Sequence, residues 1–201
     1  YSHVGETSGG PSGVMSNSEY FVRLAQAVVK VITEISSEGA VYRVDLRLRP
    51  QGGEGDLAVS LAAALDYYRS RAREWELQML IKGRCAAGDA EVCQRFLREL
   101  QPRIFPAGGP SLTREGIAAV EAVLNARQEI TEQLRRRAAN GKPHAAEWNV
   151  KLSPGGIRDI EFLVQCLQRV HGSDEPWVAA PAAASTLVAL QRLHDKGYLS
   201  G

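Results

Sequence analysis

The chain has 201 residues, of which 44% are hydrophobic and 23% are charged, and its formal net charge is +1. This length and apolar content suffice for one large or two small folded domains. The near-neutral charge argues against a general nucleic-acid binder, and the lack of an apolar run of about 18 residues or of a signal-peptide pattern argues against a membrane span or export.

The cysteines and histidines do not predict a metal site. Cys85 and Cys93 lie in helical sequence and Cys166 is distant from both, so the three thiols lack the close spacing of zinc ligands. Free cysteines at packing positions are typical of a reducing compartment, which favours a cytoplasmic protein. The histidines are scattered, without partners at zinc-ligand spacing: His3, His144, His171 and His194.

The first residues predict a loop followed by a helix. Residues 5–13 are rich in glycine and serine, which favours a flexible loop. Asn17 or Ser18 is suited to cap a helix over roughly Glu19–Ile35. Apolar residues recur on one side of this helix and predict a buried stripe: Phe21, Leu24, Val28, Val31 and Ile35.

The stretch Val41–Arg49 predicts a β-strand, because apolar and charged residues alternate along it. Asp45 is the only acid on the charged face, which it shares with arginines. Such a face suits chemistry on phosphates, since a carboxylate can hold a divalent cation and guanidinium groups can neutralise phosphoryl oxygens. The alternative is an exposed sheet edge protected by charges. Pro50 ends the strand, and the loop Gly52–Gly55 follows.

From Ser60 onward the pattern predicts only helices. Ser60 is placed to cap a long helix whose apolar seam runs unbroken from Leu61 to Met79. Further helices are expected over about 90–100, 111–139, 153–171 and 182–196, with a proline-rich connector at 102–110 and a turn at 140–143. In the helix that ends at His171, the packing side is predicted to comprise Ile157, Ile160, Leu163, Val164 and Leu167.

These elements predict an α+β protein that is mainly α. Residues 1–56 are expected to form the C-terminal part of an α/β domain, and residues 57–201 a helical bundle domain. The first residues have the character of a strand end, and Tyr1 stands where an initiator methionine is expected. We therefore expect the chain to be a fragment of a longer protein.

Three long segments carry a family resemblance. They are YRVDLRLRPQGGEG at 42–55, SLAAALDYYRSRAREWELQMLIKGRCAAGD at 60–89 and KLSPGGIRDIEFLVQCLQ at 151–168. In this order and spacing they resemble the glutamine synthetase adenylyltransferase family, bifunctional bacterial enzymes that add adenylyl groups to glutamine synthetase and remove them. The resemblance covers essentially the whole chain.

The resemblance implies a nucleotidyltransferase site. Each half of such an enzyme has a nucleotidyltransferase domain followed by a helical domain, and the site combines a paired Asp-x-Asp with a third acid on a neighbouring strand. Asp45 matches the third acid, which implies a catalytic and Mg²⁺-binding role. The paired aspartates are expected before Tyr1, so the fragment alone is expected to be inactive.

Several basic residues are candidates to bind nucleotide or phosphate. Arg47 and Arg49 share the face of Asp45 and are placed to meet phosphate, although a salt-bridged surface is the alternative. Lys82 and Arg84 are candidates to lie near the anionic substrate at a domain junction, or else to form a solvated basic face.

Gly155 and Gly156 start a predicted helix, where free backbone N–H groups can bind a phosphate. Close packing against another helix is the alternative explanation for two adjacent glycines.

The resemblance also implies a reaction and partners. Lys151–Phe162, with Arg158 at a position where the adenylylating half tends to have Thr, and the pair Tyr67-Tyr68 favour the half that removes AMP by phosphorolysis and releases ADP. The implied partners are glutamine synthetase, ATP or ADP, inorganic phosphate and a nitrogen-signalling regulatory protein. Two alternatives remain, namely the adenylylating half and a non-catalytic nucleotidyltransferase-like binding scaffold.

Overall fold

The computed structural model describes residues 1–7, 13–37, 39–40, 42–107, 121, 125, 128–129, 132, 136, 150–151, 153 and 155–199. These residues form two compact units. The first comprises residues 1–72 and 87–100, and the second comprises residues 73–86 and 101–201. The predicted helix at 111–139 and turn at 140–143 fall almost entirely outside the described residues.

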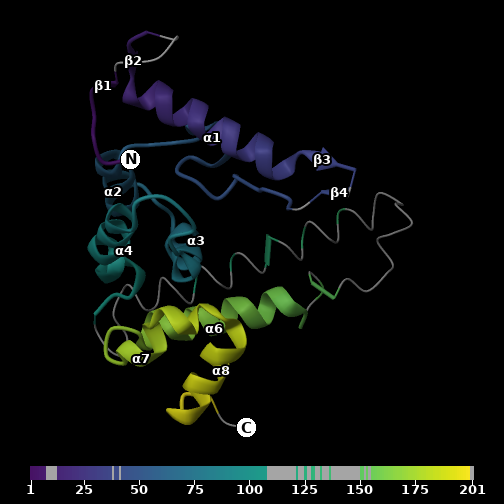
Figure 1. The fold of residues 1–201 in the computed structure, drawn as a ribbon. Helices are drawn as coiled ribbons and strands as arrows, with labels where there is room; N and C mark the ends of the chain where they lie inside the picture. The colour runs from purple at the N-terminus through teal and green to yellow at the C-terminus, as the bar shows by residue number, and fades with distance from the viewer. Residues whose placement is uncertain are drawn as a thin grey trace. The chain divides into compact units, whose positions relative to one another are not determined.

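The first unit begins with two short hairpins on either side of a long helix (Figure 1). Strands β1 (Glu6–Thr7) and β2 (Met15–Ser16) pair antiparallel, as do β3 (Ile35–Ser36) and β4 (Gly39–Ala40). Between the hairpins, α1 spans Asn17–Thr33. Its N-cap is Ser16, whose hydroxyl accepts a hydrogen bond from the Glu19 N–H, so the helix is confirmed and the predicted cap was one or two residues late.

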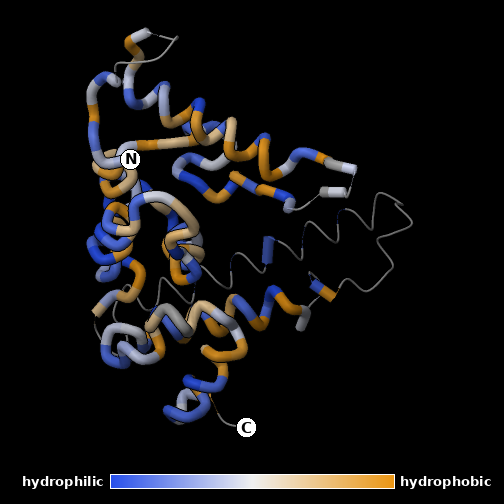
Figure 2. Tube along the Cα trace, viewed as in Figure 1, coloured by the Kyte–Doolittle hydropathy of each residue, from blue (hydrophilic) through white to orange (hydrophobic). Residues whose placement is uncertain are grey.

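The predicted buried stripe of α1 is wrong. Apolar residues recur along α1 (Figure 2), but the helix has no fully buried residue, and Val31 is 73% exposed. Ile35, predicted at the end of this helix, lies beyond it in β3 and is 78% exposed. The pattern predicts which side can pack, whereas burial also needs a covering element. At the N-terminal end of α1, Phe21 stacks on Tyr1 with ring centroids 4.7 Å apart, whereas Leu24 and Val28 further along are about half exposed.

The predicted strand at 41–49 is also not formed. Residues 42–47 have no regular secondary structure, and a short 3₁₀ helix, η1 (Gly52–Glu54), follows. A strand exists only when its N–H and C=O groups pair with a neighbour, and no described strand pairs with these residues. Tyr42 and Leu48, on the predicted apolar face, are accordingly exposed.

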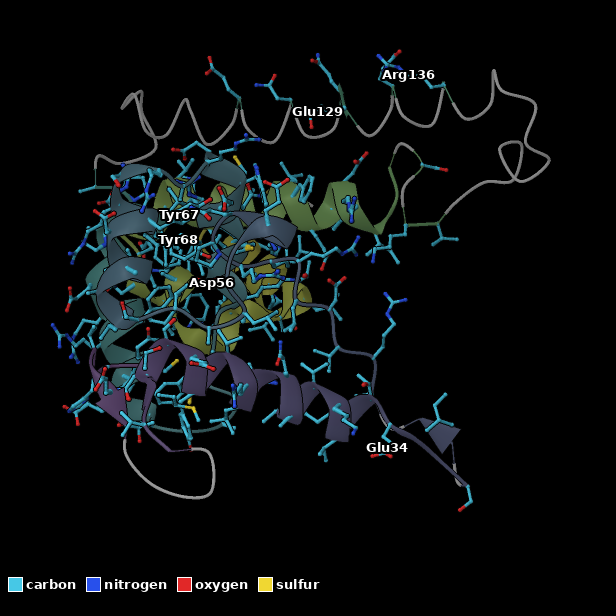
Figure 3. The ribbon with its side chains drawn as sticks, turned by 90° about the horizontal axis from the view of Figure 1, so that it is seen from above. Glu34, Asp56, Tyr67, Tyr68, Glu129 and Arg136 are labelled. Atoms are coloured by element: carbon cyan, nitrogen blue, oxygen red, sulfur yellow. The ribbon has the colours of Figure 1, made fainter. Side chains whose placement is uncertain are left out.

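The core of the first unit is formed by α2 (Leu61–Ser70) and the beginning of α4 (Ala90–Ile104). The hydroxyl of Ser60 accepts from the Ala63 N–H, so the predicted cap is confirmed. Tyr67 and Tyr68 project from α2 (Figure 3), and the buried ring of Tyr68 also meets Phe96 of α4 edge to face. This unit therefore extends past the boundary predicted at residues 56–57.

The long helix predicted from Leu61 to Met79 is broken. After α2 the chain turns at Arg71, and α3 (Glu74–Met79) starts a new helix, followed by η2 (Leu80–Lys82). The Arg73 N–H donates to the Glu76 carboxylate at 2.9 Å, which satisfies a backbone group at the new helix start. Apolar spacing does not detect such a break, because the seam resumes in phase.

The second unit packs short helices against α6 (Ile157–His171). These are α7 (Pro176–Ala179), η4 (Pro181–Ala184) and α8 (Thr186–Asp195). The predicted helix ending at His171 is confirmed, and the one predicted at 182–196 is divided into η4 and α8. The core of this unit comprises Val164, Val178, Ala183, Ala189 and Leu193.

The buried face of α6 differs from the predicted one. Ile157, Ile160 and Leu163 are about half exposed, whereas Gln165, Gln168 and Arg169 are buried. The buried polar groups meet carbonyls and side chains of other segments; the Gln168 amide, for example, donates to the Val178 and Ala183 carbonyls at 3.1 and 2.9 Å. The predicted mainly helical class is confirmed. The helix α4 extends further than predicted and includes Pro102, which was expected in a connector.

Candidate functional site

Asp45 lies on the irregular segment of the first unit and forms a close ion pair with Arg47. The Arg47 Nη2 and Nε atoms lie 2.6 and 3.1 Å from Oδ2 of Asp45. Its Nε and backbone N lie 2.9 and 3.1 Å from Oδ1. Both carboxylate oxygens are therefore bound by one neighbouring residue, as in a bidentate arginine–carboxylate pair.

This pairing sets the charge of the site. The hydrogen bonds from Arg47, assisted by its charge and that of Arg43, hold the pKa of Asp45 well below its usual range. The carboxylate in turn raises the pKa of Arg47. Asp45 is thus an anion at any physiological pH, although its side chain is 40% exposed and that of Arg47 is 80% exposed. An exposed pair of this kind is open to exchange with other ligands.

Asp45 by itself does not fit a complete magnesium site. Hard cations combine several oxygen ligands, and the described part of the chain contains no group of three or more His, Cys, Asp or Glu side chains placed to hold a metal ion. The carboxylate of Asp45 suits one ligand of a larger set, since hard cations such as Mg²⁺ prefer ionised carboxylate oxygens.

Arg49 is placed differently from the prediction. Its guanidinium group donates to the backbone carbonyls of Gly55 at 2.9 Å, Gly53 at 2.8 Å and Leu46 at 2.5 Å. Arg49 is therefore turned into its own loop, and the predicted phosphate contact is not supported by its position in the structure.

Lys82 and Arg84 belong to the second unit. The Lys82 ammonium lies 2.6 Å from a carboxylate oxygen of Glu161 on α6 and 3.3 Å from the hydroxyl of Thr186 on α8. Lys82 thus links three elements of its own unit through a partly exposed ion pair. Arg84 follows η2 and is exposed, in agreement with the alternative that it belongs to a solvated basic face.

The backbone groups at the start of α6 are already satisfied. The Gly155 N–H donates to the Asp159 carboxylate at 2.8 Å, and the Gly156 N–H donates to the Ser153 carbonyl at 2.8 Å. The Ile157 and Arg158 N–H groups donate to the carbonyls of residues 150 and 151. The expected free N–H groups for a phosphate are therefore absent from this described turn. The alternative, close packing of both glycines against another helix, is also not seen, because the atoms nearest to Gly156 belong to its own turn and Gly155 has open space around it.

Gly156 shows why a glycine is needed there. A Cβ atom on Gly156 would lie 2.5 Å from the Val150 oxygen and 2.8 Å from the Ser153 oxygen, and main-chain atoms cannot yield easily. Gly155 has φ +79°, which favours glycine, but has open space around it.

Sequence reasoning missed a buried charge cluster in the second unit. Arg169, 1% exposed, forms an ion pair with Glu74 at 2.8 Å and donates to the Ile104 carbonyl at 3.1 Å. Hydropathy offers no signal for this cluster, because it depends on contacts between segments far apart in sequence.

A hollow of about 680 Å³ lies elsewhere in the first unit, among Tyr1, Phe21, Val59, Leu61 and Phe96. None of the predicted site residues lines it.

The described part of the chain also has no helix with the length and hydropathy that a membrane span requires.

Comparisons with known proteins agree with the motif resemblance. A family model described as glutamate-ammonia ligase adenylyltransferase matches residues 1–99, and one described as GlnD PII-uridylyltransferase matches residues 125–201. A bifunctional glutamine synthetase adenylyltransferase/adenylyl-removing enzyme of Nitrosococcus oceani is 36% identical over 175 residues, covering 87% of this chain and 17% of the relative. Its namesake in Pseudomonas aeruginosa is 34% identical over 199 residues, covering 99% of this chain and 18% of the relative.

The chain thus spans less than a fifth of the length of these curated relatives. The matched regions cover most of the chain, and the first family model spans the segment around Asp45. The chain therefore belongs to the glutamine synthetase adenylyltransferase family.

Proposed function

We propose that this chain is part of a nucleotidyltransferase that removes AMP from adenylylated glutamine synthetase by phosphorolysis. Family membership and the names of the relatives, which cover both adenylyl transfer and adenylyl removal, support the enzyme class. The segment from Lys151 to Phe162 and the Tyr67-Tyr68 pair support the removing direction. The observation that carries the proposal is the ionised Asp45 beside the exposed guanidinium of Arg47.

In the proposed reaction, an oxygen of inorganic phosphate attacks the phosphorus of the adenylyl-tyrosine. The new P–O bond gives ADP, the bond to the tyrosine oxygen breaks, and that oxygen takes up a proton. Charge spreads over the phosphoryl oxygens as the attacking and leaving oxygens pass through an in-line arrangement. An exposed guanidinium such as that of Arg47 suits the binding of such oxygens.

Magnesium is the proposed cofactor, and Asp45 is the proposed ligand in this chain. When bound, such an ion neutralises developing charge on the attacking and leaving oxygens. One carboxylate does not complete the coordination, so further acidic ligands are proposed to come from the same enzyme outside this chain.

Glutamine synthetase, nucleotide and phosphate are the proposed partners, together with a nitrogen-signalling regulatory protein. A cytoplasmic location is proposed from the same resemblance.

The test is the Asp45→Asn variant in a full-length enzyme that carries this segment. We expect phosphate-dependent release of ADP from adenylylated glutamine synthetase to be abolished, because the variant loses the acidic charge. ATP-dependent adenylylation should survive. Loss of adenylylation with retention of ADP release would assign this segment to the adenylylating half, and retention of both reactions would assign it to a binding scaffold.

A further inference from the structure

We propose that Arg49 is a positioning residue, whose guanidinium group locks the loop at residues 50–55 against the segment that carries Asp45 and Arg47. This inference rests on the proposed role of Asp45 as a catalytic acid. It replaces the phosphate contact that the sequence suggested for Arg49 and divides the work of the two arginines between substrate binding and positioning.

The contacts of Arg49 join two parts of the chain. Nη1 donates to the carbonyl of Leu46, which precedes the loop, while Nη2 and Nε donate to the carbonyls of Gly53 and Gly55 within it. Each of the three guanidinium nitrogens thus binds a different carbonyl. Because the guanidinium group is planar and rigid, these three bonds hold the carbonyls in one fixed arrangement.

The loop at residues 50–55 has a tightly constrained backbone. The Gly52 N–H donates to the Arg49 carbonyl at 2.8 Å, which closes a tight turn. Gln51 and Gly52 are consecutive left-handed residues, with φ values of 63° and 62°, and Gln51 is the only non-glycine residue with positive φ among those described. Left-handed backbone is unfavourable for a residue with a side chain and persists where the surroundings enforce it.

Gly55 adds an independent sign of close fit. A Cβ atom on Gly55 would lie 2.0 Å from the Pro50 carbonyl oxygen, so the two ends of the loop touch through their backbones. Gly53, by contrast, has nothing within 4 Å of a Cβ position. The loop thus tolerates a side chain at one glycine and excludes it at another.

We call the three hydrogen bonds from the Arg49 guanidinium group the clamp. The clamp acts on the site through the carbonyl of Leu46. This residue stands between Asp45 and Arg47 in sequence, so fixing its carbonyl restrains the backbone from which both side chains project. Among the described residues, the exposed side chain of Arg47 binds only Asp45, whereas the half-buried side chain of Arg49 binds backbone carbonyls. Arg47 is therefore free to exchange partners, and Arg49 is not.

The main test compares Arg49→Gln and Arg49→Lys with Arg98→Gln in the full-length enzyme. Arg98 is an exposed arginine of α4 in the same unit. For both Arg49 variants we expect kcat to fall about 10- to 100-fold, as misplacement of a catalytic group does, while KM for phosphate stays within about twofold. Lysine should not rescue, because a single ammonium cannot reproduce the planar fork. Arg98→Gln should retain the kinetic constants of the unchanged enzyme.

Hydrogen exchange measured by mass spectrometry gives a second readout. The peptide covering residues 46–58 should exchange faster in both Arg49 variants, while peptides from α2 and α4 should keep their rates. An increase in KM for phosphate with unchanged kcat and unchanged exchange would overturn the proposal and make Arg49 a phosphate ligand. Unchanged kinetics in both Arg49 variants would also overturn it.

A glycine pair tests the loop without altering Arg49. Gly55→Ala should lower kcat like Arg49→Gln, because the new methyl group displaces the Pro50 carbonyl, whereas Gly53→Ala retains its carbonyl and should act like the unchanged enzyme. Equal activities of the two glycine variants would contradict the clamp.

Both directions of the reaction are assayed throughout. If the Arg49 and Gly55 variants lower kcat of ATP-dependent adenylylation and spare ADP release, the clamp holds and only the proposed direction fails.

Discussion

The buried guanidinium of Arg169 on α6 forms an ion pair with Glu74 on α3, with Nη1 2.8 Å from Oε2, although the two residues are 95 positions apart. Arg169 also donates to the Ile104 carbonyl at the end of α4. One charged side chain therefore connects α6, α3 and the C-terminal end of α4 within the second unit. Its positive charge is tolerated in the interior because a carboxylate and carbonyl oxygens surround it.

Replacing Arg169 should destabilise the second unit strongly. Arg169→Ala removes the ion pair and leaves buried carbonyl oxygens without a donor, so we expect a loss of about 3–5 kcal/mol in the free energy of unfolding. Arg84→Ala, at an exposed site of the same unit, should change it by less than about 0.5 kcal/mol. Urea unfolding of the 201-residue chain, followed by circular dichroism, measures both. Similar effects of the two variants would show that the cluster is not important for stability.

Removing Arg47 should raise the pKa of Asp45. In the unchanged chain the carboxylate should stay ionised at pH 3.8, the ordinary pKa of an aspartate, because hydrogen bonds from Arg47 stabilise the anion. In Arg47→Gln, the carboxyl should be substantially protonated at that pH. Carboxyl carbon NMR of the chain reads this directly. Arg98→Gln, at an exposed arginine of α4, serves as the control. A change of similar size in the pKa of Asp45 in that variant would contradict the role assigned to Arg47.

Alanine should be unfavourable at both of two adjacent glycines, Gly155 and Gly156, for different physical reasons. Gly156→Ala should cost about 1–3 kcal/mol, since the methyl group meets the Val150 and Ser153 oxygens. Gly155→Ala should cost about 1–2 kcal/mol, from left-handed backbone alone. Thermal unfolding measures both in the presence and absence of phosphate. Phosphate-dependent stabilisation that both variants lose would instead reveal an anion site at this turn.

Acidification should weaken the second unit through His171. This buried ring stacks on Tyr198 with centroids 3.6 Å apart, and burial lowers its pKa below 6.5, against the opposing effect of Asp174 and Glu175. The unfolded chain then binds more protons than the folded chain below about pH 6.5. Stability should fall as pH decreases from there, by at most about 1.4 kcal/mol per pH unit, until the folded-state pKa is passed.

His171→Phe tests this prediction, because phenylalanine retains the stacking and removes the titrating group. The melting temperature of the variant should vary less between pH 5 and pH 7.5 than that of the unchanged chain. His194→Phe, at an exposed histidine of α8, is the matched control. Equal pH dependence in the unchanged chain and His171→Phe would contradict the role of His171.

The positions of helices were predictable because their causes are local. Ser60 caps α2 with its own hydroxyl, and α6 ends at His171 as expected, although it begins at Ile157 and not at residue 153. In contrast, the strand around Asp45 was not found, since its backbone needs partners that no local pattern supplies. The pairing of Asp45 with Arg47 follows from their spacing, whereas the inward turn of Arg49 depends on the path of the loop.

The sequence by itself determined the family and the mainly helical class and singled out Asp45 as the candidate acid, because these reside in long motifs and in interactions between near neighbours. Only the tertiary structure decided which faces are buried and which charges are satisfied. Gln168 and Arg169 are buried where their hydropathy predicts exposure, because carbonyls from Ile104, Val178 and Ala183 meet them there. Burial is a property of the surroundings, and a residue type sets only its cost.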